Sequence, residues 1–197
     1  MEKNLLLIIS GPAGSGKNTV AERMMAAFPQ IKRVVTSTSR PPRGQEKDGV
    51  DYHFLPPEKF EAAIKNGDFY EYAKVHDRYY GTSKKEVTEA LKSGKDLILI
   101  IDVQGASTWR EIAKTDPLIA EKMLSVFIAP QSIDILRARL KGRGTESEAD
   151  IERRMKTALD EFKRKDDFDA FIDSTTMEAD FEAMKGIYLG AKQVPAK

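Results

Sequence analysis

The sequence contains no cysteine, and this absence excludes several kinds of chemistry at once. Without thiols the chain forms no disulfide, has no thiolate nucleophile and holds no metal through sulfur. A cysteine-free composition also suits a reducing compartment, so we expect a cytoplasmic protein. Histidine occurs only twice. We see no histidine–carboxylate pair for general acid–base catalysis and expect His53 and His76 to be packing or surface residues.

Long apolar runs and an excess of one charge are also missing. The N-terminal apolar run, residues 5–9, is followed by Gly11 and Pro12 and is too short for a secretory leader or a membrane span. The 32 basic and 31 acidic side chains leave a formal charge of +1. We therefore expect neither nucleic acid nor membrane as a partner, and any anion site must be local.

The balance of hydrophobic and charged residues is typical of a single globular domain. Hydrophobic residues make up 41% and charged residues 32% of 197 residues. Apolar stretches predict strands buried on both faces at 5–10, 97–103, 123–128 and 171–172. Helical spacing or capping signals predict helices around Val20, Met24 and Phe28, between Ser83 and Gly94, and at 133–140, 151–162 and 181–188. This alternation predicts an α/β fold of three α/β/α layers around a mostly parallel sheet.

One segment breaks the alternation. Residues 36–80 contain four prolines, many charges and several tyrosines. We interpret this segment as an inserted lobe rather than part of the sheet. In such folds the ligand crevice lies at the carboxyl ends of the parallel strands, so a lobe inserted there can reach it.

A glycine-rich loop follows the first predicted strand and precedes a predicted helix. This context favours a phosphate-binding G-x-x-x-x-G-K loop over an ordinary turn whose lysine points into water. Backbone amides and the helix N-terminus would contact phosphate oxygens, and the lysine would reach the outer phosphates. The candidate ATP-binding residues are Gly11, Pro12, Ala13, Gly14, Ser15, Gly16, Lys17, Asn18 and Thr19.

The metal position departs from this pattern. Asn18 replaces the serine or threonine that usually follows the lysine and holds Mg²⁺. Thr19 is one alternative ligand, and a water held by Asn18 is another. Asp102 ends an apolar run and is a candidate second anchor for the ion. An ordinary strand-end aspartate is the plainer interpretation of that residue taken alone.

Residues 102–105 also outline a GTPase switch motif. The guanine-reading motif of a GTPase is missing, because residues 113–116 lack its leading asparagine and follow too soon. We therefore give the GTPase little weight.

From Leu6 to about Tyr188 the chain resembles the guanylate kinase family of P-loop nucleoside monophosphate kinases. Besides the phosphate loop, the blocks that carry the resemblance are residues 39–43, 51–54, 69–73, 79–82, 101–105 and 139–145, in the family's order and spacing. The resemblance implies Mg²⁺-dependent phosphoryl transfer from ATP to GMP. It also implies a core of residues 1–35, 84–138 and 155–197, a GMP-binding lobe of residues 36–83 and a lid of residues 139–154.

The resemblance assigns roles to residues outside the phosphate loop. It implies that the acceptor phosphate is held by Arg40, Arg43, Tyr52 and Tyr80, whose guanidinium and phenol groups suit a phosphate. It implies that Glu71, Thr36 and Thr82 contact guanine and that Asp102 belongs to the GMP site. Without the resemblance, the two arginines would fit a solvated basic turn, and the two tyrosines would fit packing against the lobe. Catalysis is assigned to Lys17 and to three lid arginines, Arg139, Arg143 and Arg154.

The chain departs from the family pattern at Asn18, Gln45, Ile100 and Ser174. Ile100 stands where the family usually has an acidic residue, and Ser174 replaces an asparagine often placed near adenine. Two alternatives remain: a catalytically silent protein-binding domain, and a kinase for another nucleoside monophosphate, with dGMP as a second substrate of the same enzyme. The sequence does not predict the oligomeric state.

Overall fold

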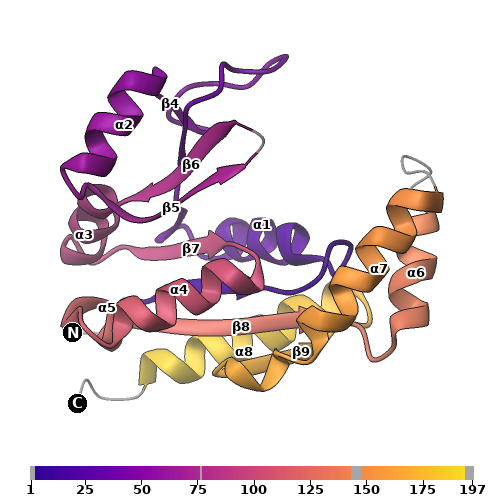
Figure 1. Ribbon diagram of the computed structural model, residues 1–197. Helices are drawn as coiled ribbons and strands as arrows, with labels where there is room; N and C mark the ends of the chain where they lie inside the picture. Colours follow the sequence, from indigo (N-terminus) through magenta and orange to yellow (C-terminus); the bar gives the residue numbers. More distant parts are fainter. Residues whose placement is uncertain (1–2, 76, 143–147, 194–197) are drawn as a thin grey trace.

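The computed structural model describes residues 3–75, 77–142 and 148–193 (Figure 1). Its central sheet has five strands in the order β2-β7-β1-β8-β9, and every pairing is parallel. The strands are β1 (Leu6–Ser10), β2 (Ile31–Arg33), β7 (Asp96–Ile100), β8 (Met123–Ala129) and β9 (Ala170–Asp173). A parallel sheet covered on both faces explains the continuous apolar runs in these segments.

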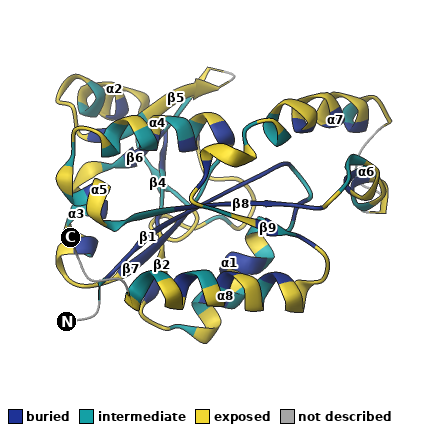
Figure 2. Cartoon of the chain, turned by 90° about the horizontal axis from the view of Figure 1, so that it is seen from below, coloured by how far each residue is buried: buried dark blue, intermediate teal, exposed yellow. Residues whose placement is uncertain are grey.

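Helices cover both faces of this sheet (Figure 2). Because strand side chains alternate, Leu6 and Ile8 join one buried cluster while Leu7 and Ile9 join the other. The first cluster is covered by α3 (Lys84–Lys92), α4 (Val103–Ala113) and α5 (Pro117–Lys122), and the second by α1 (Lys17–Ala27) and α8 (Met177–Gln193). The three-layer α/β/α architecture is therefore confirmed.

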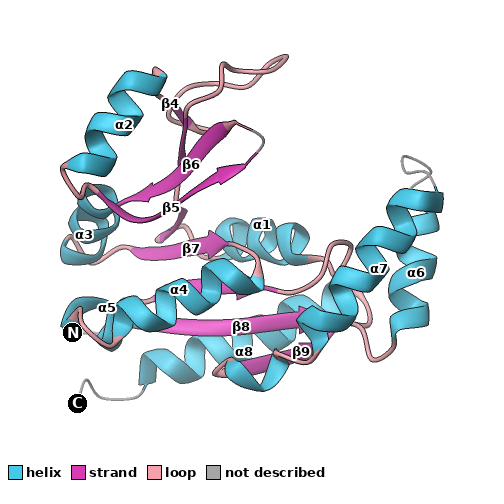
Figure 3. Cartoon of the chain, viewed as in Figure 1, coloured by secondary structure: helices cyan, strands magenta, loops and turns pink. Residues whose placement is uncertain are grey.

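A second sheet lies above β7 in the view of Figure 3. Its strands, in the order β4-β3-β6-β5, are β3 (Ser37–Thr38), β4 (His53–Phe54), β5 (Phe69–Val75) and β6 (Arg78–Ser83). Helix α2 (Pro57–Lys65) packs on it through Phe60, whose ring stacks on Phe69 and Tyr79 at centroid distances of 4.5 and 5.4 Å. The lobe thus has its own aromatic packing.

Two helices project from the other end of the molecule (Figure 1). These are α6 (Ile133–Gly142) and α7 (Glu148–Phe162), and the short 3₁₀ helix η1 (Lys165–Asp167) follows. Their facing sides form a separate buried cluster of Leu136, Leu140, Ile151, Met155 and Ala158. The pair therefore has a hydrophobic cluster of its own.

One predicted strand was too long, and several elements of the core and all elements of the lobe were not predicted. The strand predicted for 97–103 ends at Ile100, because Asp102 caps a new helix by accepting from the Gly105 amide at 2.8 Å. The apolar run continues into that helix through Val103, so periodicity did not mark the boundary. Strand β2 and helices α4 and α5 were missed. Ser83 does cap α3, as its pairing with Glu86 predicted.

No helix within the described ranges is both long and apolar enough to span a membrane.

Candidate functional site

The site is built where neighbouring parallel strands end. In the pairing of β1 with β7, Ile9 lies opposite Ile100. The phosphate loop begins two residues after Ile9, and Asp102 stands two residues after Ile100. Strand order alone therefore brings Gly11 and Asp102 to one edge of the sheet.

The glycines of the phosphate loop are required by its shape. Gly11, Gly14 and Gly16 have φ angles of 137°, 85° and 96°, in the region that favours glycine. A Cβ on Gly11 would also lie 2.0 Å from the Ile128 carbonyl oxygen. The loop therefore packs directly against the end of β8.

The loop presents amides and a lysine to a small pocket. Gly16 precedes α1 without a capping side chain, which leaves the first helical amides to an external acceptor such as phosphate. Nζ of Lys17 donates to the carbonyl oxygens of Gly11 at 2.6 Å and Pro12 at 2.8 Å. The pocket, about 220 Å³, is lined by Ala13, Gly14, Gly16, Lys17, Asn18 and Thr19.

A second pocket, of about 560 Å³, lies between the two sheets. Its lining brings together five of the residues assigned from the sequence to acceptor binding: Thr36, Tyr52, Glu71, Tyr80 and Asp102. The rings of Tyr52 and Tyr80 meet edge to face at 6.0 Å. Ile100 also lines this pocket, so its wall is apolar where the family pattern has a carboxylate.

Glu71 and Asp102 are the two carboxylates that line this pocket. Burial raises the pKa of the Glu71 carboxyl, the Thr82 hydrogen bond opposes that rise, and the charge of Asp102 adds to it. The Thr82 hydroxyl donates to Oε1 at 2.7 Å, and Thr82 is fully buried. The resemblance implied that Thr82 contacts guanine. In the structure its hydroxyl donates to Glu71 and orients that carboxylate.

Arg40 is fixed by a residue that the sequence analysis did not single out. Its two terminal nitrogens donate to Glu46 at 2.6 and 2.8 Å, and its guanidinium lies 4.9 Å from the centre of the Tyr52 ring. This fork raises the pKa of Arg40 and lowers that of Glu46 to about 2; the Arg43 amide, 2.8 Å from Glu46, contributes to the latter. The pair places Arg40 beside Tyr52, whereas the Arg43 side chain is exposed on the same loop.

Glu161 is another carboxylate near the phosphate loop that the sequence analysis did not single out. Burial raises the pKa of its carboxyl, the charge of Lys17 opposes that rise and the charge of Asp102 adds to it. The sequence could have indicated this position. Glu161 follows Arg154 by seven residues on α7, so the two residues share one face of the helix.

A third pocket, of about 540 Å³, lies on the other side of the phosphate loop. Gly14, Gly16 and Thr19 line it together with Arg139 of α6 and Asp180 of α8. Helix α6 touches the loop, since a Cβ on Gly14 would lie 3.0 Å from Leu140. Arg154 is exposed on α7. Arg143 lies outside the described residues.

No histidine–carboxylate pair for acid–base catalysis was expected, but His53 does have a carboxylate partner. Nε2 of His53 lies 2.6 Å from Oε1 of Glu86. The pair spans from β4 to α3, two segments far apart in the sequence. Both residues line a separate pocket together with Lys32 of β2 and with Lys95, which precedes β7, and no phosphate-loop residue lines it. His76 lies outside the described residues.

The fold and the site define a class. A parallel α/β sheet with a phosphate loop after its first strand, and a second polar pocket beyond the same strand ends, is the architecture of a P-loop nucleotide-binding protein with two substrate sites.

Comparisons with known proteins identify the family. The sequence model of the guanylate kinase family matches residues 3–189. The guanylate kinase of Clostridioides difficile (strain 630) is 39% identical over 192 residues, which cover 98% of this chain and 90% of that protein. That of Carboxydothermus hydrogenoformans is 38% identical, covering 100% and 93%. The crystal structure of guanylate kinase from Anaplasma phagocytophilum superimposes with a TM-score of 0.74 at 26% identity, covering 100% and 90%. The chain belongs to the guanylate kinase family.

Proposed function

We propose that this protein transfers the terminal phosphoryl group of ATP to GMP, giving ADP and GDP. One observation carries the proposal: the phosphate loop and the Glu71 pocket open at adjacent strand ends of one sheet. Membership of the guanylate kinase family supports the same reaction. dGMP is a second expected acceptor, and the proposed partners are these small nucleotides.

The base specificity follows from hydrogen bonding. The carboxylate of Glu71 can accept from both N1–H and the exocyclic amino group of guanine, whereas adenine offers no such pair of donors. Thr36 lines the same pocket, and Thr82 orients the carboxylate. A buried acceptor left unpaired by the wrong base is costly, so a site of this kind discriminates strongly.

Phosphoryl transfer requires positioning and positive charge rather than a general base. The acceptor phosphate is already an anion. We assign its binding to Arg40, Arg43, Tyr52 and Tyr80. Lys17, Arg139, Arg143 and Arg154 are assigned to the charge that develops on the phosphoryl group in transfer.

Mg²⁺ fits the residues present. Within the described ranges, no group of three or more acidic or histidine side chains forms a protein cage for a metal. Mg²⁺ commonly keeps several waters and is held by one or two protein ligands plus substrate phosphates. Thr19 lines the phosphate-loop pocket and Asp102 lines the acceptor pocket, and we assign these two residues as its ligands. The bound ion would neutralise phosphate charge.

The three structural units suggest a division of labour. We assign residues 36–83 to a GMP-binding lobe, residues 139–154 to a lid, and residues 1–35, 84–138 and 155–197 to the core. The separate packing of the lobe sheet and of the α6–α7 pair supports this division. A cytoplasmic location stays a prediction from the cysteine-free composition.

The test is an ADP-release assay with ATP and Mg²⁺ that offers GMP, dGMP, AMP, UMP, CMP and IMP in turn. We expect GMP to give the fastest turnover, followed by dGMP. Lys17→Ala should lower turnover about 1000-fold while circular dichroism shows an intact fold. A preference for another acceptor would reassign the substrate. A chain that binds nucleotides but does not turn over would support the silent binding domain.

A further inference from the structure

The arginine at the rim of the third pocket is held by a loop beyond the edge strand of the central sheet. Nη1 of Arg139 donates to Oγ of Ser174 at 2.8 Å. Nη2 donates to the carbonyl oxygens of Ser174 at 3.1 Å and Thr175 at 2.9 Å. The Ser174 amide in turn donates to the Ala129 carbonyl at the end of β8. The guanidinium is therefore fixed against the sheet by three bonds.

A buried carboxylate lies behind Ser174. The Ser174 hydroxyl donates to Oδ2 of Asp180 at 2.6 Å, and Oδ1 of Asp180 accepts from the Thr175 amide at 2.9 Å. Ser174 is 2% exposed and Asp180 is 5% exposed. Because a hydroxyl has one proton, giving it to Asp180 turns an oxygen lone pair toward Arg139. The carboxylate thus sets the polarity of the serine and strengthens its bond to the guanidinium.

Capping the N-terminus of α8 does not by itself explain where the Asp180 carboxylate lies. It lies in the first turn of α8, where the helix N-terminus favours a carboxylate, but it also lines the third pocket. A Cβ on Gly16 would lie 3.8 Å from its Oδ2. A negative charge this close to the phosphate loop opposes phosphate binding unless a cation balances it. Arg139 is the cation to which it is connected, through Ser174.

We infer that Ser174 and Asp180 are positioning residues that hold Arg139 at the rim of the third pocket, beside the phosphate loop that binds the donor, an inference that rests on the proposed kinase function. Neither residue is assigned to a substrate, and both act through Arg139. The amide of the family's asparagine at position 174 can donate and accept on its own. A serine needs the carboxylate to direct its hydroxyl, so the two residues form one unit.

The experiment is a double-mutant cycle in the full chain. Ser174→Ala and Asp180→Asn should each lower kcat about tenfold, the size of one charge-assisted hydrogen bond, and leave the KM for GMP within twofold. Ser174→Thr keeps the hydroxyl and should restore most of kcat. In an Arg139→Ala background, Ser174→Ala should change kcat less than twofold. Asp180→Asn tests the direction of the hydrogen bond between residues 180 and 174. The asparagine amide can donate to the Ser174 hydroxyl, whereas the carboxylate can only accept from it.

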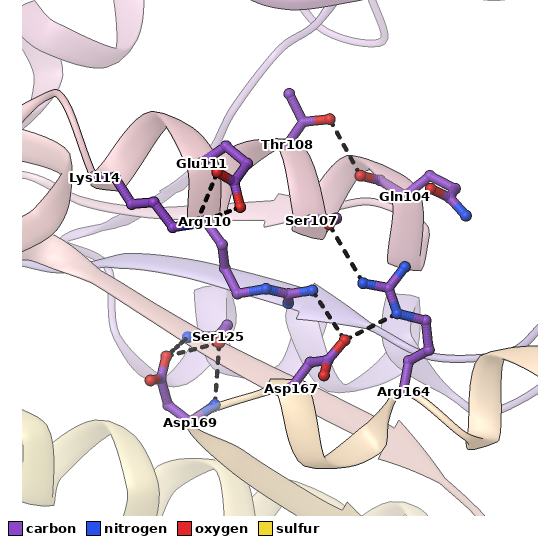
Figure 4. A network of polar contacts seen from close by, with 10 residues as sticks. All are labelled: Gln104, Ser107, Thr108, Arg110, Glu111, Lys114, Ser125, Arg164, Asp167 and Asp169. Carbon is purple, nitrogen blue, oxygen red and sulfur yellow. Dashed lines mark hydrogen bonds and ion pairs between the residues drawn. The ribbon is translucent and has the colours of Figure 1, made fainter.

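A matched control exists on the same sheet. The Ser125 hydroxyl donates to Oδ2 of Asp169 at 2.7 Å (Figure 4) and is equally buried, yet Ser125 does not line the third pocket. Ser125→Ala should lower the unfolding midpoint as Ser174→Ala does but leave kcat unchanged. This separates loss of a buried hydrogen bond from loss of arginine orientation.

The outcomes distinguish the inference from the proposed function. If the wild type fails to turn over ATP with GMP, the proposed function is wrong. ATP titration calorimetry then still tests the roles of Ser174 and Asp180. The inference predicts that Ser174→Ala weakens ATP binding only when Arg139 is present. If the wild type is active and both single variants match it, the inference is overturned. Equal losses from Ser174→Ala with Arg139 intact and in the Arg139→Ala background would also overturn it.

Discussion

At the scale of single residues, the Glu71 carboxylate decides which base the second pocket accepts. Replacing it by glutamine keeps the volume but exchanges one acceptor oxygen for an amide that repels the guanine donors. We expect Glu71→Gln to raise the KM for GMP about 100-fold. The KM for ATP should stay within twofold, because Glu71 lies outside the phosphate-loop pockets. Initial-rate kinetics with each nucleotide varied in turn measures both values, and an unchanged KM for GMP would remove Glu71 from the site.

The same carboxylate predicts a pH dependence. Burial raises the pKa of Glu71 above that of an ordinary carboxyl. Guanine needs the deprotonated form, so GMP affinity should be complete above the raised pKa and fall as the pH drops through it, before ordinary carboxylates titrate. GMP binding measured by calorimetry from pH 7.5 to 5 tests this. The phosphate of GMP also titrates in this range, so the Glu71→Gln variant, which retains only the phosphate contribution, is the control. Parallel profiles for the two proteins would contradict the assignment.

The site residues differ in how far the sequence could predict them. The phosphate loop was readable because a fixed spacing of glycines and lysine meets one geometric need. The lobe residues were assigned from the family resemblance, since their single blocks also fit an ordinary surface. Glu46 was missed because its role depends on the fold of the loop that returns it to Arg40. Glu161 was missed because the charges that act on it, those of Lys17 and Asp102, belong to other elements.

At the scale of elements, the phosphate loop depends on its contact with β8. Gly11→Ala forces a Cβ to 2.0 Å from the Ile128 carbonyl oxygen and strains a φ of 137°. We expect it to lower the free energy of unfolding by about 3 kcal/mol. The matched variant is Gly44→Ala, whose φ is 53° with no atom within 4 Å of the added Cβ, at a cost of about 1 kcal/mol. Urea unfolding compares the two, and equal midpoints would show that the loop moves away from β8 at little cost.

The predicted boundaries of helices matched the structure where a capping residue marked them in the sequence. Ser83 and Gly94 bounded α3 because the cap and the left-handed turn are local features. The end of β7 was misplaced because apolar residues continue from the buried strand into the buried face of α4. Asp116 caps helix α5, and Pro117 is its first residue, which is a common signal for the start of a helix. This signal was missed because residues 113–116 were considered only as an incomplete base-binding motif.

At the scale of the whole molecule, the lobe lies above β7, and the α6–α7 pair projects from the side of the molecule toward which β8 points (Figure 1). Each has its own packed side chains, so each can move as a unit. Positive groups assigned to the two phosphates lie on both units, and bound substrates should draw them together and exclude water.

This arrangement predicts a more compact molecule when both sites are filled. A chain of this length has a radius of gyration of about 16 Å. Small-angle scattering should show it fall when a non-hydrolysable ATP analogue, Mg²⁺ and GMP are all present, and fall less with either nucleotide alone. AMP in place of GMP is the control, because Glu71 should not hold adenine and the lobe should stay open. If the ternary mixture scatters like the free protein, closure is not part of the mechanism. Water would then have to be excluded by the pockets as they stand.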